Sequence, residues 1–124
     1  MLNQTGIKTV SGTTRKTILV DEMNSTAFSV VVANTGVNAV DGKKIIKAGT
    51  PVAGSLLARN TPFTVANDAT AVGLVLHDVD VTAGNANSQV VVFGFIDESK
   101  LEADVVEKLT PAVKGALKMI QFVK

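Results

Sequence analysis

The sequence predicts an α+β fold that is mainly β, a small antiparallel β barrel or sandwich with one or two short helices near the C-terminus. Three observations predict this class. Valine is the commonest of the 124 residues and threonine is abundant, and both pack well on a pleated sheet. Short apolar segments alternate with turn sequences such as Asn34 to Gly36. A clear apolar stripe of helical period occurs only near the C-terminus.

Seven segments show the strand pattern, in which β-branched and aromatic residues are bounded by turn residues. These predicted strands are residues 17–20, 28–33, 43–47, 52–58, 71–79, 89–95 and 117–123. Beyond Leu74 the apolar residues occupy both faces of the strand at first, whereas Asp78 and Asp80 then make one face polar. We expect this strand to run from the core to the surface.

Asp41 and Gly42 lie between residues 37–40 and 43–47. This dipeptide is typical of a type I′ turn, in which both central residues need a positive φ angle. The sequence therefore predicts a β-hairpin around Asp41-Gly42.

The first predicted helix covers residues 98–109. Leu101, Val105 and Leu109 recur every four residues and form one apolar stripe. Asp97 precedes the stripe and is suited to be the N-cap. We expect this stripe to pack against the sheet.

A second, shorter helix is predicted after Thr110, which is suited to be its N-cap, with Pro111 at the first helical position. Gly115 is suited to end it. A final strand follows, and because strands and helices do not alternate along the chain, the sheet is expected to be antiparallel.

Two regions are predicted: a flexible N-terminal arm at residues 1–16, rich in glycine and threonine, and a single β-rich domain at residues 17–124. The N-terminus does not show a basic segment followed by a sustained apolar stretch, so an export signal is not expected. No segment approaches the ~20 apolar residues of a membrane-spanning helix. We therefore expect a soluble protein without an export signal of its own.

The charge balance limits the partners of the chain. Twelve Lys and Arg residues face eleven Asp and Glu residues, a formal net charge of +1, which gives no general attraction for nucleic acid or anionic membranes. The absence of cysteine excludes disulfides, thiolate catalysis and cysteine-based zinc sites. Neither nucleic acid nor membrane is an expected partner.

His77, Asp78 and Asp80 are the first candidates for a metal or general-base site. Asp78 and Asp80 share one face of the predicted strand, whereas His77 points to the other face, so the three ligands do not converge. We interpret the segment as the polar end of a strand, and expect no metal there.

A second candidate is an acidic cluster from which a pair of carboxylates for acid–base chemistry could be drawn. Its members are Asp97, Glu98, Glu102, Asp104 and Glu107. The pattern favours a solvated helix face with i,i+4 partners among Lys100, Lys108 and Lys114. With no Gly-x-Ser-x-Gly elbow either, the sequence predicts no catalytic set, no cofactor and no enzymatic activity.

Two further motifs have simpler structural interpretations. Residues 49–54 begin and end with glycine but lack the lysine of a P-loop and precede a strand, so a turn is expected. Lys43, Lys44 and Lys47 form a cationic cluster without a nearby aromatic residue to stack a base. We interpret these lysines as protection of an exposed edge strand.

The order of three segments resembles that in the lambda-like head decoration proteins of tailed bacteriophages. The segments are the Thr-Pro turn of residues 48–54, the small-residue strand of residues 68–76 with its Ala-Val-Gly sequence, and the Val-rich strand of residues 89–95, followed by the helical stretch and a closing strand. The resemblance covers residues 48–124. The chain departs from the family's best-known member in lacking tryptophan and an Ala- and Pro-rich arm.

The resemblance implies a homotrimer on the exterior of the virion capsid that binds the major capsid protein and stabilises the shell. The N-terminal arm would then add a strand to a capsid sheet. Two alternatives remain open: a phage head fibre, or another small β-barrel module that binds carbohydrate or peptide.

Overall fold

The structure is a computed structural model that describes residues 17–20 and 22–124. The predicted arm, residues 1–16, lies outside the described residues. The fold is mainly β, with antiparallel sheets and two short helices near the C-terminus, so the predicted fold class is confirmed. Of the barrel and the sandwich, the sandwich fits the described chain, in which no barrel closes.

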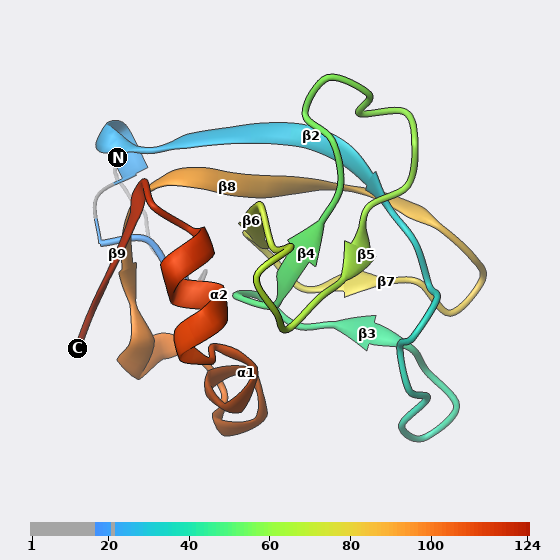
Figure 1. Cartoon of the computed structure of the whole chain (residues 1–124). Helices are drawn as coiled ribbons and strands as arrows, with labels where there is room; N and C mark the ends of the chain where they lie inside the picture. The colour runs from blue at the N-terminus through green and yellow to red at the C-terminus, as the bar shows by residue number, and fades with distance from the viewer. Residues whose placement is uncertain (1–16, 21) are drawn as a thin grey trace, which may run out of the picture.

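The larger sheet is organised around β8 (Ala86–Asp97), a strand of 12 residues. β2 (Thr26–Val32) pairs antiparallel with one side of β8. The other side of β8 pairs first with β6 and then with β9, and β4 and β5 follow β6 (Figure 1). The bounds of these four strands are Gly73–Val75 (β6), Ile120–Val123 (β9), Pro51–Ala53 (β4) and Thr64–Val65 (β5).

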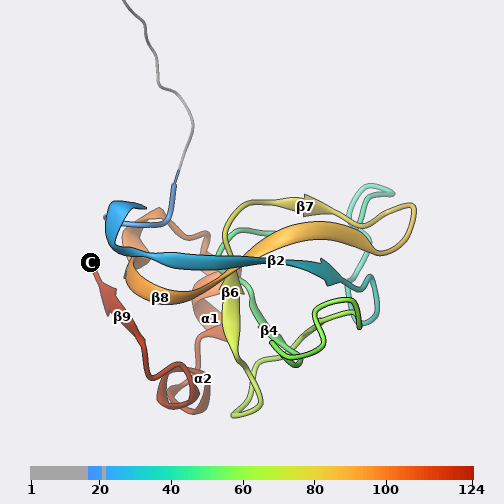
Figure 2. The ribbon, with the colours of Figure 1, turned by 90° about the horizontal axis from the view of Figure 1, so that it is seen from above.

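Layers on both faces cover the larger sheet. A two-stranded sheet of β3 (Ile45–Ile46) and β7 (Val79–Asp80) packs on one face. The helices α1 (Ala103–Lys108) and α2 (Pro111–Ala116) lie on the other face, as the view from above shows (Figure 2). A short 3-10 turn, η1 (Glu22–Asn24), precedes β2.

Each layer boundary holds its own apolar core. The helix-side core joins Leu101, Val105 and Leu109, the predicted apolar stripe, to sheet residues such as Leu74 and Ile96. The sheet-side core fills the space between the two sheets with valine and isoleucine side chains around the fully buried Phe63. The stripe therefore packs on the sheet, as the sequence predicts.

The predicted helix over residues 98–109 is divided into two pieces. η2, a 3-10 helix, covers Glu98–Lys100, and α1 begins only at Ala103. Asp97 is the N-cap of η2, and its Oδ1 accepts from the Ser99 amide at 3.0 Å. Leu101 is extended (φ −89°, ψ 149°) and buried. The break thus directs Leu101 into the core at the point where a continuous helix was expected.

The second helix begins as predicted but does not end at Gly115. The Thr110 hydroxyl accepts from the Val113 amide at 3.3 Å, and Pro111 is the first helical residue. Gly115 lies inside α2, and Leu117 is the C-cap. Burial of Val113 and Leu117 maintains the helix through Gly115, which costs about 1 kcal/mol relative to alanine.

The expectation of a purely antiparallel sheet was wrong at one pair, because β8 and β9 run parallel. A parallel neighbour requires a crossover connection of a dozen residues or more, usually helical. Residues 98–119, which contain η2, α1 and α2, form this connection. The apolar stripe identifies the helices, but their role as a crossover depends on where β9 pairs.

Several predicted strands are shorter than expected. Residues 17–20 form only one bridge, between Leu19 and Ile96. The strand predicted at 52–58 ends at Ala53, because Gly54 turns against Phe63; a Cβ on Gly54 would lie 2.6 Å from the Phe63 ring. The strand predicted at 71–79 is divided by a bend into β6 and β7. β5, a two-residue partner of β4, was not predicted.

The turn at Asp41-Gly42 is formed as predicted. Both residues have positive φ angles, 53° and 79°, and Val40 and Lys43 exchange two backbone hydrogen bonds of 2.8 and 3.0 Å. The ladder stops after this pair, however, because β3 pairs with β7 instead. Pairing with β7 places β3 beside the sheet-side core, in which Ile46 is buried with only 2% of its surface exposed.

Replacing Val105 with Asp should unfold the domain. Val105 is 1% exposed in the helix-side core, and an unpaired buried carboxylate costs several kcal/mol, against a total stability of about 5 to 15 kcal/mol. The neighbouring Val106 is 36% exposed, so Val106→Asp is the matched control and should melt close to the wild type. Circular dichroism melting of both variants tests the packing, and equal melting temperatures would contradict it.

Candidate interaction surface

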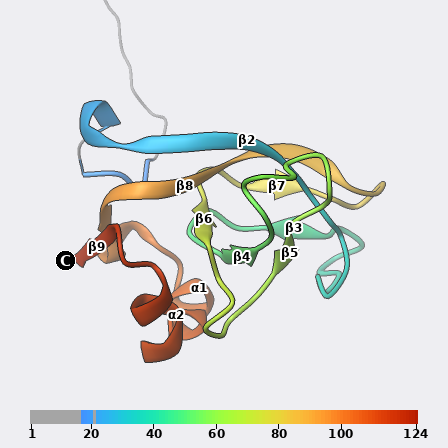
Figure 3. The same ribbon diagram turned by 45° about the horizontal axis from the view of Figure 1, so that its top comes forward.

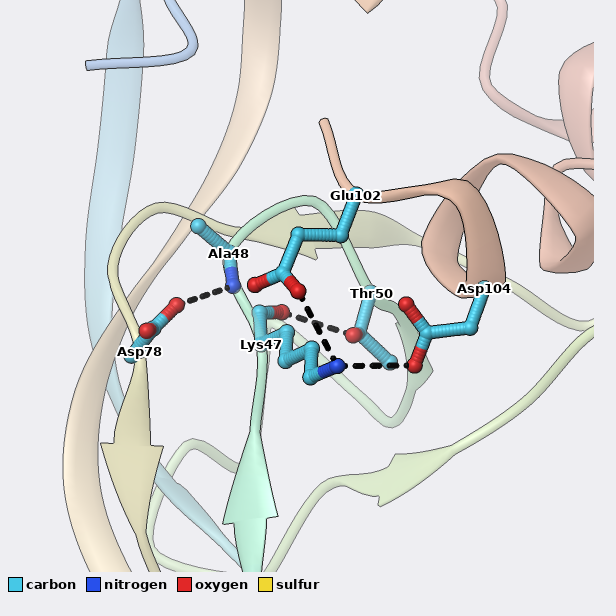
Figure 4. A network of polar contacts seen from close by, with 6 residues as sticks. All are labelled: Lys47, Ala48, Thr50, Asp78, Glu102 and Asp104. Carbon is cyan, nitrogen blue, oxygen red and sulfur yellow. Dashed lines mark hydrogen bonds and ion pairs between the residues drawn. The ribbon is translucent and has the colours of Figure 1, made fainter. Parts of the chain in front are cut away.

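Lys47 links the strand layer to the helical crossover. It follows β3, and its Nζ lies 3.2 Å from Glu102 Oε1 and 3.0 Å from Asp104 Oδ2, at the start of α1 (Figure 4). Gly49 (φ +91°) lies in the turn that follows Lys47. It packs closely on Leu101 of the helical crossover, since a Cβ added to Gly49 would lie 2.5 Å from Leu101 Cδ2. The turn and the helix are therefore joined by both charge and close packing.

The ion pairs shift the pKa values of the groups that form them. The hydrogen bond to Asp104, followed by that to Glu102, raises the pKa of Lys47 above its ordinary 10.5. The hydrogen bond from Lys47 lowers the pKa of Asp104 below its ordinary 3.8. All three side chains are substantially exposed, so the network positions the turn more than it stabilises the domain.

The ion pairs of the acidic residues after β8 are formed with lysines of other elements. Glu102 and Asp104 pair with Lys47, and Glu98 Oε2 lies 2.7 Å from Lys114 Nζ in α2. Asp104 has Lys108 at i+4 within α1, and the charge of Lys108 helps to lower the pKa of Asp104, so the i,i+4 prediction holds for this pair. It does not hold for Glu98, because the break at Leu101 interrupts the predicted helix. The carboxylates connect separate elements and do not converge on one cleft.

The Glu98–Lys114 pair is the most buried charge pair of the described chain. The Glu98 side chain is 7% exposed and that of Lys114 is 39% exposed. The Lys114 ammonium also lies 5.1 Å from the centre of the Phe122 ring, so it contacts β9 as well. This contact attaches the end of the crossover to the last strand.

Asp78 and Asp80 do not lie on one strand as predicted, because Asp78 lies in the bent segment before β7 and only Asp80 belongs to β7. Asp78 Oδ1 accepts from the Ala48 amide at 2.8 Å (Figure 4), and Asp80 Oδ1 accepts from the Thr82 amide at 2.9 Å. The hydrogen bonds with Thr82 lower the pKa of Asp80. Among residues 17–20 and 22–124, no group of three or more His, Cys, Asp or Glu side chains could hold a metal ion. His77 and Asp78 border an open hollow of about 680 Å³ beside β7 and β8.

The remaining motifs also have structural roles. The turn expected over residues 49–54 covers only the start of that segment, where the Thr50 hydroxyl donates to the Lys47 carbonyl at 2.6 Å. Residues 51–53 form β4 instead. The Lys44 amide donates to Thr82 Oγ1 at 2.8 Å. Lys43 and Lys44 directly precede β3, a strand of a two-stranded sheet, which agrees with protection of an edge. Lys47 follows β3 and forms ion pairs instead.

β8 contains a bulge that changes which of its side chains face the helices. Val90 lies in the sheet-side core and Val91 in the helix-side core, so strict alternation would put Ile96 with Val90. Ile96 instead lies in the helix-side core with Val91. The register with β2 skips Val92 at this point, which identifies it as the extra residue.

The bulge turns Phe93 and Phe95 toward the side of the two-stranded sheet. β7 of that sheet does not reach the C-terminal end of β8 (Figure 2). Phe93 and Phe95 are consequently 43% and 46% exposed. Val20, whose amide donates to the Phe95 carbonyl at 3.0 Å, is 56% exposed, and Val123 at the end of β9 is 39% exposed. We call these four residues the bare face.

The bare face was not predicted from the sequence. Phe93 and Phe95 fall within a predicted strand, but the side that a strand exposes depends on the bulge at Val92 and on the length of the covering sheet. One signal was available, because Gly94 between two phenylalanines inside a strand indicates a bulge or a close backbone approach. Gly94 (φ +141°) indeed lies close to Ser25, since a Cβ added to Gly94 would lie 3.1 Å from the Ser25 Cβ.

No protein-family model matches the chain, and no curated protein matches it significantly. Within the described chain, none of the helices has the length and apolar character needed to cross a membrane. The geometry of the surface is therefore the basis for the function proposed below.

The contribution of the Lys47 network to stability should depend on pH at both extremes. Asp104, with a lowered folded-state pKa, stabilises the fold above its ordinary 3.8 and loses this effect as the pH falls through the lowered value. Lys47, with a raised pKa, stabilises it below 10.5 and loses the effect as the pH rises through the raised value. The difference in melting temperature between wild type and Lys47→Met should thus be constant from about pH 5 to pH 9 and shrink outside that window.

Lys44→Met is the control for this titration, because Lys44 forms no ion pair among the described residues. Its melting temperature should track that of the wild type at each pH. A Lys47→Met difference that persists unchanged at pH 2 would show that the side chain acts through its packing and not through its charge.

Proposed function

We propose that this protein is a bacteriophage head decoration protein that assembles as a trimer on the outside of the capsid, binds the major capsid protein and stabilises the shell. The observation that carries the proposal is the bare face, a surface suited to docking against another protein. The resemblance in the order of segments over residues 48–124 supports the particular class.

The composition of the bare face supports a protein partner. The chain has only five phenylalanines and no tryptophan or tyrosine, yet two phenylalanines lie exposed side by side on one strand. Aromatic residues are enriched in the centres of protein interfaces and are frequent binding hot spots. A sheet face that its own covering layer leaves open is therefore a site for a second protein.

The position of the bare face supports a link with the N-terminal arm. Val20 belongs to the bare face, and its amide is bonded to β8 through the Phe95 carbonyl. Thr17, the first described residue, lies three positions before Val20 in the chain, and residues 1–16 precede it. An arm that adds a strand to a capsid sheet and an apolar face that docks on the same capsid subunit would act on one partner.

Capsid stabilisation requires buried area and correct geometry, not reactive groups. Three copies related by a rotation can close a ring through one repeated heterologous contact, and such a ring fits a local three-fold position. The near-neutral charge of the chain agrees with attachment by apolar burial and backbone pairing, which salt screens only weakly.

Phe95→Asp should weaken capsid binding at least tenfold while the domain stays folded. Phe95 is 46% exposed, so the fold tolerates a polar side chain, whereas loss of an aromatic hot spot costs about 2 kcal/mol or more. Cosedimentation of each variant with undecorated capsids at physiological salt measures the effect. Leu57→Asp is the matched control, because Leu57 is 99% exposed in the loop between β4 and β5 and is not part of the bare face.

Native mass spectrometry of the free protein tests the assembly. The proposal predicts a species with the mass of three chains that persists upon dilution. A monomer at all concentrations, or Phe95→Asp protein that decorates capsids as tightly as the wild type, would contradict the corresponding part of the proposal.

A further inference from the structure

We infer that the outer edge of β9 is a docking site for an extended, acidic segment of a partner protein, which adds to the sheet as a further strand. This inference concerns a different surface from the bare face. It holds whether or not the partner is a capsid protein. Four observations support it: an open strand edge, its lack of protection, a groove along it, and two unpaired lysines that flank it.

The outer edge of β9 is open in the described chain. β9 pairs only with β8, and it lies at the margin of the fold (Figure 3). The Gly94 amide donates to the Met119 carbonyl at 3.2 Å, whereas the Ile120 amide donates back to Leu117 at 3.2 Å and not to β8. Since alternate residues of a strand turn their backbone groups to opposite sides, Phe122, two residues beyond Ile120, also turns its N–H and C=O to the open side.

β9 lacks the features that protect exposed edges. Natural edge strands are usually very short, charged, interrupted by proline or covered. β3, β5 and β7 have two residues each. The outer edge of β2 is partly occupied, because Phe63 donates to the Val31 carbonyl at 2.7 Å and the Arg59 guanidinium donates to the Ser29 carbonyl at 3.4 Å. β9 has four residues, none of them charged or proline.

A groove of about 560 Å³ runs beside this edge. Its lining comes from β9 itself, from the residues that lead into it, and from Glu98 and Lys114. Four residues of strand span about 13 Å, so β9 can pair with a segment of similar length. The space beside the open backbone groups is therefore available to a further strand.

The charges around the groove select an acidic segment. The ammonium group of Lys114 is already paired with Glu98 and stacked on Phe122. Lys118 and Lys124 are exposed, and neither forms an ion pair among the described residues. They flank β9 at its two ends, so carboxylates near the ends of an added strand would meet one lysine each.

The test uses the full-length protein and a capped heptapeptide of alternating valine and glutamate. The proposal predicts that peptide binding slows hydrogen exchange of the Phe122 amide at least tenfold, as measured by NMR. The Gln121 and Val123 amides, which face β8, should be unaffected. No binding up to about 1 mM, or binding without protection of Phe122, would overturn the proposal.

Two controls separate strand addition from general attraction. Lys118→Glu with Lys124→Glu should weaken binding about tenfold, whereas Lys43→Glu with Lys44→Glu makes the same change in net charge away from the groove and should leave binding unchanged. Equal weakening by both pairs would assign the effect to net charge and overturn the site. The same peptide N-methylated at alternate residues should not bind, and retained binding would exclude backbone pairing.

Discussion

The backbone pairing of β8 is the constraint on which the rest of the structure depends. This strand pairs with β2 along one side and with β6 and β9 along the other, and residue 96 also bridges to Leu19. Its side chains supply both cores, with Val90 in one and Val91 and Ile96 in the other. In a regular strand, successive side chains point to alternate faces of the sheet. The extra residue at Val92 shifts this alternation, so that Ile96 faces the helices and Phe93 and Phe95 face the opposite, uncovered side.

The helical crossover depends in turn on contacts at both of its ends, and the turn of residues 47–50 makes those at its start. Gly49 has no side chain to keep Leu101 away, and Lys47 reaches the two carboxylates at the start of α1. At the other end of the crossover, Lys114 joins the buried Glu98 to Phe122 of β9. These contacts position the last strand parallel to β8, and they thereby create both its open outer edge and the groove beside it.

The sequence predicts the parts of this molecule that depend on local chemistry. The type I′ turn at Asp41-Gly42, the Thr110-Pro111 helix start and the apolar stripe through Val105 all follow from residue type and spacing. It does not predict the partners of Glu102 and Asp104, since Lys47 lies more than 50 residues away in the chain. The bare face was missed for a similar reason, because the exposure of Phe93 and Phe95 depends on a bulge and on the extent of another sheet.

The parallel pairing of β8 and β9 has a consequence for the order in which the chain folds. Paired residues of these strands are 26 positions apart, as between Gly94 and Ile120, and the helices between them close the loop. The partners of β2 on β8 are 54 to 67 positions away, from Val32 with Ala86 to Thr26 with Phe93. β6 is nearer still to β8, since Val75 and Val90 are 15 positions apart. Since closing a longer loop costs more entropy before any contact forms, β8 should pair with β6 and β9 first, and β2 should dock later. During synthesis, the valine-rich sequence of β2 must therefore wait for β8, whose paired residues are made more than 50 positions later.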